Sequence, residues 1–94
     1  MPYYIILLNL LEGGQRDIQE GGKARAQIFE QLQKAGGRSV GGYFTFGQYD
    51  AVEIVEAPND ELILRLALMA PPGQVRTTTL KAFPIDEVMK MIKK

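Results

Sequence analysis

The chain has 94 residues, its 11 basic and 11 acidic side chains cancel, and it contains neither cysteine nor histidine. A chain of this length predicts one domain spanning residues 1–94, with one layer of helices on one sheet, so we expect any substantial cavity to need a second subunit. The composition excludes disulfides, thiol or Ser-His nucleophiles, and metal or haem sites that depend on cysteine or histidine. We therefore expect no metal and no cofactor, and the zero net charge disfavours nucleic acid as a partner.

The chain begins with a run from Tyr3 to Leu11 that is apolar except for Asn9. Such a run is typical of a strand covered on both faces. It lacks the basic flank of a signal peptide and is too short to span a bilayer. We expect a cytoplasmic protein that makes no membrane contact.

A polar loop bracketed by Gly13-Gly14 and Gly21-Gly22 follows the first strand. From Lys23 the apolar residues recur at helical spacing, and Gly36-Gly37 stands where a left-handed C-terminal cap belongs. The residues 39–46 and 49–57 then predict two strands joined by a two-residue turn at Gly47-Gln48.

The second helix begins after Asn59, a suitable N-cap residue, and ends before residues 71–73, which read Pro-Pro-Gly. A fourth strand is predicted over residues 75–83, and Pro84 suits the first turn of a terminal helix. One face of that helix is apolar, since Ile85, Val88, Met89 and Ile92 fall at positions i, i+3, i+4 and i+7. The order β-α-β-β-α-β predicts an α+β, ferredoxin-like fold with a C-terminal helix.

The predicted sheet has a second apolar face, because both alternating residue sets of the first strand are apolar. Leaving that face in water would expose several hundred Å² of apolar surface, and a second copy packed sheet to sheet is the economical cover. The second helix is also apolar on its outer side, at Leu64, Leu68 and Met69. We expect that side to meet another subunit or the chain's own terminal helix, and we favour a tetramer or larger ring of dimers.

The sequence resembles the GYD family, small bacterial and archaeal proteins named for a Gly-x-Tyr-Asp element. The element is Gly47-Gln48-Tyr49-Asp50 here, and the strand from Tyr3, residues 55–58 (Val-Glu-Ala-Pro) and residues 75–83 also match. The resemblance implies a dimeric α/β barrel in the ferredoxin-like superfamily and no established general activity. Gln48 departs from the basic residue that we expect there, which puts an anion-binding role of that position in doubt.

Tyr49, Asp50 and Glu53 are the candidate catalytic residues, because a phenol beside a carboxylate can transfer protons if burial raises the pKa of the acid. The alternative for Asp50 is binding of turn amides. Glu53 faces away from the helices if Val52 and Ile54 form the core, which would place its carboxylate in the dimer cavity. Its structural alternative is an ion pair with Arg76 or Lys81.

Arg76 offers a planar fork for a carboxylate or a planar ligand, and the tyrosines, among them Tyr43, could line an aromatic pocket. The candidate ligand-binding residues are therefore Tyr43, Tyr49, Asp50, Glu53 and Arg76.

The leading hypothesis is a homo-oligomeric protein that binds a small organic molecule between its two sheets or serves as a structural accessory protein. One alternative is a cofactor-free monooxygenase or isomerase that uses a carboxylate and a tyrosine in the cavity. A second alternative is a stand-alone effector-binding regulatory module.

Overall fold

The computed structural model describes residues 1–12 and 18–93, and these form an α+β fold. The elements in chain order are β1 (Tyr3–Leu10), α2 (Ile18–Lys34), β2 (Arg38–Phe44), β3 (Ala51–Glu56), α3 (Asp60–Ala67), β4 (Val75–Ala82) and α4 (Ile85–Ile92). Within these residues, no helix combines the length and the apolar character that crossing a membrane requires.

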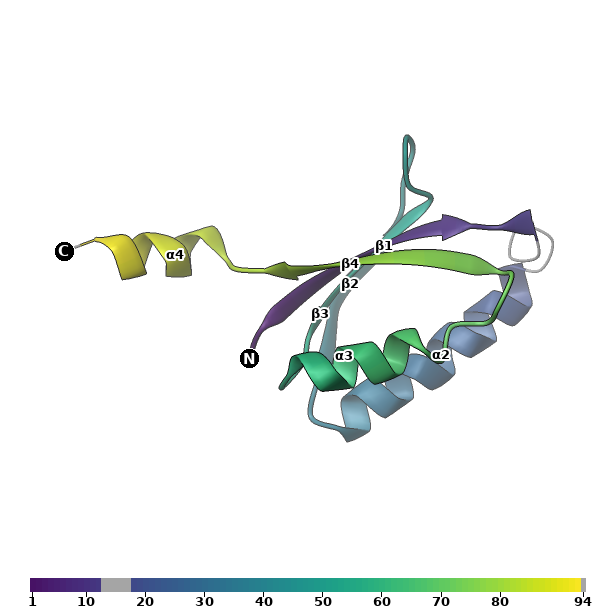
Figure 1. Cartoon of the computed structure of the whole chain (residues 1–94), viewed down its shortest axis with the longest axis horizontal. Coiled ribbons are helices and arrows are strands. Elements are labelled where there is room, and N and C mark those ends of the chain that lie inside the picture. Colours follow the sequence, from purple (N-terminus) through teal and green to yellow (C-terminus); the bar gives the residue numbers. More distant parts are fainter. Residues whose placement is uncertain (13–17, 94) are drawn as a thin grey trace.

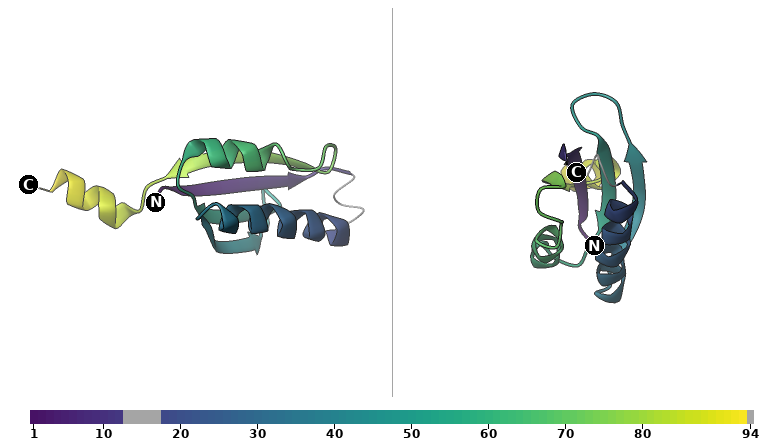
Figure 2. Two further views of the ribbon diagram at one scale, coloured as in Figure 1. Left: turned by 90° about the horizontal axis from the view of Figure 1, so that it is seen from below. Right: turned by 90° about the vertical axis from the view of Figure 1, so that its right-hand side faces the viewer.

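The four strands form one antiparallel sheet in the order β2-β3-β1-β4. The apolar strand β1 is central, between β3 and β4, as its two-sided apolar character predicts. Helices α2 and α3 lie side by side on one face of the sheet (Figures 1 and 2). This arrangement confirms the ferredoxin-like prediction.

Helix α2 begins earlier than the sequence predicts, at Ile18 instead of Lys23. The pair Gly21-Gly22 was expected to bound a loop but lies inside the helix, and the loop's other glycines fall outside the described residues. Ile28 and the buried Leu32, further along the helix, pack toward the sheet, and this packing compensates for the poor helix propensity of glycine.

The C-terminal cap of α2 is confirmed. Gly36 adopts a φ of 94°, in the left-handed region, and its amide donates to the carbonyl of Gln33 at 3.1 Å. The Gly37 amide donates to the Leu32 carbonyl at 2.9 Å, which completes a Schellman motif. The motif turns the chain directly into β2.

The hairpin between β2 and β3 differs from the predicted two-residue turn, because β2 ends at Phe44 and β3 begins at Ala51. The Thr45 amide donates to the Asp50 carbonyl at 2.9 Å, and the Thr45 hydroxyl donates to the Tyr49 carbonyl at 2.7 Å. One backbone bond and one side-chain bond thus close a connection that spans residues 45–50. Gly47, with a φ of 101°, supplies the left-handed residue that this turn needs.

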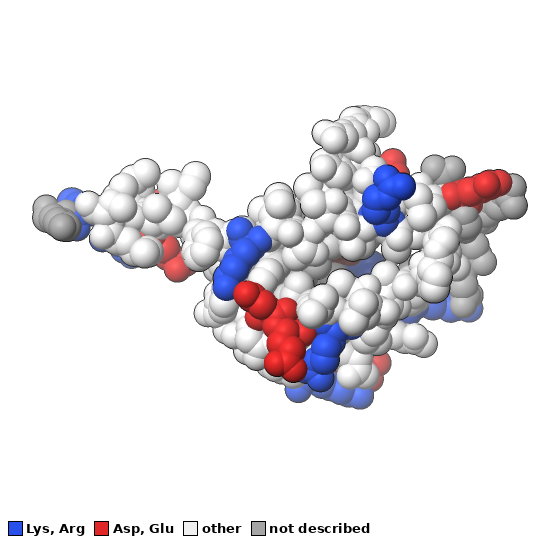
Figure 3. All heavy atoms as spheres, in the orientation of Figure 1, with Lys and Arg blue, Asp and Glu red and all other residues white. Residues whose placement is uncertain are grey.

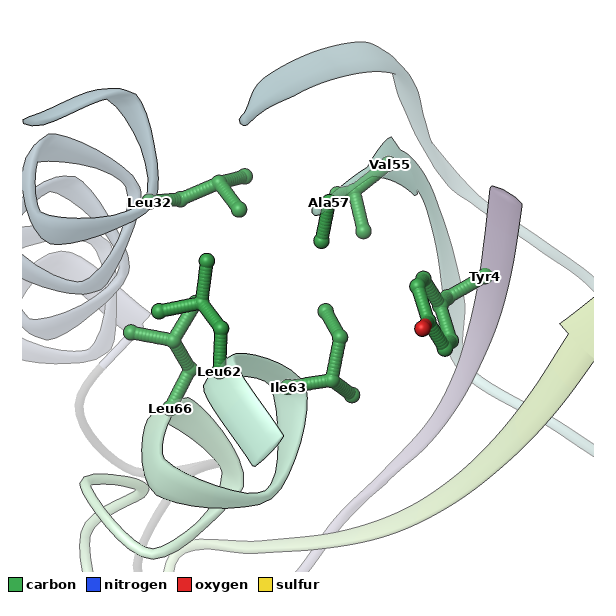
Figure 4. Close-up of a cluster of buried hydrophobic side chains, with 7 residues drawn as sticks. All are labelled: Tyr4, Leu32, Val55, Ala57, Leu62, Ile63 and Leu66. Carbon is green, nitrogen blue, oxygen red and sulfur yellow. The ribbon is translucent and has the colours of Figure 1, made fainter. Parts of the chain in front are cut away.

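Helix α3 begins as predicted, since the Asn59 side chain accepts a hydrogen bond from the Leu62 amide at 2.9 Å. Its buried residues Leu62, Ile63 and Leu66 join a core whose other members are Tyr4, Leu32, Val55 and Ala57 (Figure 4). Leu64 is 61% and Leu68 78% exposed, as expected for the outer side of α3. The core fixes both helices against the end of the sheet where β1 begins.

Helix α4 forms where the sequence predicts it, but it projects beyond the end of the sheet and does not cover α3 (Figure 1). Ile85 is 74%, Met89 54% and Ile92 66% exposed. The possibility that the chain's own terminal helix packs on the outer side of α3 is therefore wrong. The short connection from β4 through Phe83 and Pro84 directs the helix away from the domain.

Candidate functional site

The sheet face opposite α2 and α3, called the open face below, is largely apolar. Tyr4 and Val55 lie in the core on the helix side, so the residues that alternate with them point to the open face. Tyr43 is 61% and Leu80 47% exposed there. The apolar side chains of the open face include Tyr3, Ile5, Leu7, Tyr43, Val52, Ile54 and Leu80.

A polar cluster of Tyr3, Arg38 and Glu56 lies at one end of the open face, and the sequence analysis did not single it out. Glu56 lies opposite Tyr3 on β1 and opposite Arg38 on β2. A hydrogen bond from Tyr3, together with one from Arg38, lowers the pKa of Glu56. The same bond to Glu56 raises the pKa of Tyr3. Glu56 is thus held as a carboxylate at the edge of an apolar surface.

The Asp50 carboxylate binds backbone at the other end of the sheet. Its Oδ2 accepts a hydrogen bond from the Leu10 amide at 2.7 Å, and its own amide donates to the Leu8 carbonyl at 2.8 Å. Tyr49, beside it, is half-buried. These bonds match the structural alternative for Asp50, and a role of Tyr49 or Asp50 in ligand binding or proton transfer stays a prediction.

Arg76 lies at the same end of the sheet as Asp50. It is opposite Asn9 on β1, and the Asn9 side-chain amide donates to the Gln48 carbonyl at 2.8 Å. Tyr43 is on β2, at the opposite edge of the sheet, and three strand spacings of about 4.8 Å put it roughly 14 Å away across the sheet. Asp50 directly precedes β3, one strand from β2 and two strands from β4, so the fold separates Arg76 from Tyr43 and places Asp50 between them.

The expected orientation of Glu53 is wrong. Glu53 points to the helix side with Val55, is 9% exposed, and pairs with Arg25 of α2. Neither suggested partner on β4 is used in this way, since Lys81 lies 3.0 Å from Asp60 and Arg76 is on the open face. Both alternating sets of β3 contain apolar residues, so the sequence leaves the phase of the strand undecided.

A cavity of about 620 Å³ lies between the sheet and the two helices, which corrects the expectation that a substantial cavity needs a second subunit. It extends from the core, whose residues Leu32, Val55, Ile63 and Leu66 also line it, toward the end of the sheet where β4 begins, and Figure 3 shows a hollow between the two layers with charged atoms inside it. Among the residues that the structure describes, Arg25 and Glu53 are the charged ones that line it. Among its apolar residues are Ile6, Leu8, Ile28, Phe29, Ile63 and Val75.

The cavity and the open face offer little for metal chemistry. Across residues 1–12 and 18–93, no three aspartate or glutamate side chains gather as metal ligands do. What the two surfaces offer is apolar contact area with a few fixed charges. Such surfaces are suited to binding an apolar ligand or a protein.

Comparison with known proteins places these features in a family. Residues 4–92 match the GYD domain. The chain is 30% identical over 95 residues to a Thermus thermophilus protein named "Glutamine synthetase and cystathionine beta-lyase binding protein", covering 99% of this chain and 100% of that protein.

Solved structures share the fold. TTHA0845 from Thermus thermophilus is similar with a TM-score of 0.53 at 22% identity, over 88% of this chain and 94% of that chain. FFRP-DM1 gives a TM-score of 0.59 at 21% identity, over 88% of this chain and 100% of that chain. MtbAldR gives 0.59 at 17% identity, over 87% of this chain and 51% of that chain.

Proposed function

The chain belongs to the GYD domain family, and from that premise we propose that it is a cytoplasmic, homo-oligomeric accessory protein that binds a partner enzyme. Two copies pair through their open faces, and the partner binds the outer surface of the dimer. The apolar open face is the observation that carries the proposal. The name of the Thermus thermophilus relative, which describes a protein that binds two enzymes, supports the class of partner.

The size of the open face bears on how two copies would pair. Four strands of up to 8 residues give a face of roughly 20 by 25 Å, or about 500 Å². A stable interface needs about 800 Å² from each partner. The sheet alone falls short, so further apolar surface must contribute.

Helix α4 supplies that surface in the proposed dimer. It projects past the sheet with Ile85, Met89 and Ile92 exposed, and none of its residues is buried in its own chain. An amphipathic helix of this length gains stability mainly from packing its apolar face. In the proposed dimer, α4 of each copy packs against the other copy.

The outer side of α3 is the proposed surface for the partner enzyme. Leu64 and Leu68 are exposed there, and Met69 is 45% exposed. Methionine and leucine side chains adapt to partner surfaces, and Arg65 adds a charge between them. A second dimer is the competing occupant of this surface.

A small organic ligand between the two sheets is the second part of the proposal, with Arg76, Tyr43, Tyr49 and Asp50 at the rim. Glu53 no longer belongs to that site, because it points to the helices. The enzyme alternative therefore lacks Glu53 as a base in the dimer cavity. The other candidate base, the Asp50 carboxylate, accepts a hydrogen bond from the Leu10 amide. Binding is therefore the role that the geometry supports better.

Light scattering and native mass spectrometry test the dimer. At low micromolar concentration the protein should have twice its chain mass of 10.5 kDa, or a multiple of that. Leu80→Glu on the open face should give a folded monomer, because a buried unpaired charge opposes association. A monomeric parent protein contradicts the proposal.

Biolayer interferometry against glutamine synthetase and cystathionine beta-lyase from the same host tests the partner. We expect the parent dimer to bind one of them, and Leu64→Glu to weaken that binding at least tenfold while the dimer mass stays the same. Gln27→Glu, which introduces the same negative charge at an exposed position of α2, is the matched control. Binding that is absent, or that is insensitive to Leu64→Glu, contradicts this assignment.

A further inference from the structure

The cavity between the sheet and the helices has the size of a ligand site within a single chain. Its volume of about 620 Å³ lies within the range of roughly 300 to 1,000 Å³ that is usual for small-molecule pockets. The core borders the cavity at one end, where Leu32, Val55, Ile63 and Leu66 belong to both. The lining of the cavity is mainly apolar.

The cavity contains an ion pair between Arg25 and Glu53 whose geometry is fixed by several contacts. Glu53 is 9% exposed, and its two carboxylate oxygens accept hydrogen bonds from Nε and Nη2 of Arg25, the second at 3.0 Å. The Arg25 guanidinium also lies 4.3 Å from the centre of the Phe29 ring. The bidentate bond and the ring together fix the plane of the guanidinium.

Gly42 leaves room for this pair. A Cβ atom at that position would lie 2.3 Å from Glu53 Oε1 and 3.0 Å from Arg25 Nη2. Any larger residue on β2 would thus displace the carboxylate or the guanidinium. Gly42 on β2 therefore leaves the Arg25–Glu53 ion pair the space that a side chain would occupy.

The accessible hydrogen-bonding capacity of the pair lies mainly on its cationic member, because the Glu53 side chain is only 11% exposed. Each oxygen of Glu53 accepts a bond from Arg25. A guanidinium has five N–H groups, and this geometry uses two of them. The Arg25 side chain is 50% exposed and lines the cavity, so its remaining N–H groups are accessible to an anion.

We infer that the cavity binds a small amphipathic monocarboxylic acid. The carboxylate of the ligand accepts hydrogen bonds from the N–H groups of Arg25 that Glu53 does not use. The hydrocarbon part lies among the apolar residues of the cavity, such as Ile6, Ile28 and Ile63. This site lies within one chain and is independent of the proposed dimer.

Isothermal titration calorimetry with hexanoate, octanoate and octan-1-ol, all below their aggregation limits, tests the inference. Affinity should rise about three- to fourfold for each added methylene group, because each one buries more apolar surface. Octanoate should bind at least tenfold more tightly than octan-1-ol, since a charged hydrogen bond exceeds a neutral one. Equal affinity for the acid and the alcohol overturns the role of Arg25.

The matched variant is the double substitution Arg25→Gln with Glu53→Gln, which removes both charges without leaving either one buried alone. We expect it to lose at least tenfold in octanoate affinity and to keep its affinity for octan-1-ol. Lys34→Gln, which removes one positive charge from the same helix, should bind octanoate like the parent. An unchanged octanoate affinity in the double variant overturns the inference.

Methyl NMR locates the ligand. Octanoate should shift the methyl signals of Ile6, Ile28 and Ile63, which line the cavity, and leave those of Ile5 and Ile54 on the open face unchanged. Shifts confined to the open face, or no saturable binding by a folded protein, overturn the inference. Native mass spectra of the same samples report the dimer separately, so failure of either proposal is recognised by itself.

Discussion

The substitution Tyr4→Phe tests how much the hydrogen bond from Tyr4 of β1 to Asp60 of α3 stabilises the folded protein. Tyr4 is 2% exposed, and its hydroxyl donates to Asp60, which also lies 3.0 Å from the Lys81 ammonium. Burial first, and the bond to Asp60 second, raise the pKa of Tyr4 from 10.0 to about 12. The neutral phenol is therefore favoured in the folded state.

The sign of the pH dependence follows from this raised pKa. The unfolded chain releases the Tyr4 proton near pH 10 and the folded chain near pH 12. The stabilisation is complete below pH 10 and is lost as the pH rises through 12. One pKa unit corresponds to about 1.4 kcal/mol, so the loss is about 1 kcal/mol by pH 11 and about 2 kcal/mol by pH 12.

Urea unfolding followed by circular dichroism measures the effect at fixed protein concentration. At pH 7, Tyr4→Phe should lower the free energy of unfolding by about 1 to 3 kcal/mol, because it removes a hydrogen bond to a charged group. The difference between the parent and Tyr4→Phe should shrink between pH 10 and pH 12. Asp60→Asn should reduce this alkaline loss without abolishing it, since burial is the larger cause. A difference that stays constant from pH 8 to pH 12 would refute the reasoning.

Three further predictions concern stability and assembly. Gly22→Ala should raise the free energy of unfolding by about 0.5 to 1 kcal/mol, since Gly22 is helical and a Cβ atom there meets nothing within 4 Å. Gly36→Ala should instead lower the free energy of unfolding by about 1 to 2 kcal/mol in the same urea assay, because Gly36 has a φ of 94°. Leu32→Ala should cost about 2 to 5 kcal/mol, because Leu32 is 1% exposed in the core, and a smaller loss in urea unfolding would show that the core is loosely packed. Leu64→Glu with Leu68→Glu should reduce any assembly larger than a dimer to a folded dimer, and an unchanged native mass contradicts that contact.

The order and type of the elements could be predicted because local signals agree with one another. The period-two and helical patterns, the Asn59 cap and the Gly36-Gly37 cap each specify one conformation from neighbouring residues. The element boundaries were less certain where packing overrides propensity. Helix α2 continues through Gly21-Gly22, and its packing comes from Ile28 and Leu32 further along the helix.

The sequence could not predict which face of β3 packs against the helices. In β3, Val52 and Ile54 alternate with Ala51, Glu53 and Val55, so either set could form the core. A shift of one residue would reverse the face of every side chain, and the pattern alone does not choose between the two phases. In the folded chain Val55 is buried in the core, and Glu53 on the same face bonds to Arg25, which is 28 residues away in the chain. A partner on another element cannot be recognised from the spacing within a strand.

The sequence by itself determined the ferredoxin-like order of elements, the central position of an apolar β1 and the amphipathic character of α4, because each depends on residues close together in the chain. The tertiary structure alone decided the phase of β3, the direction of α4 and the cavity that holds the Arg25–Glu53 pair. These features depend on how strands and helices far apart in the sequence pack together. Packing of that kind is set by long-range contacts, and no local pattern encodes them.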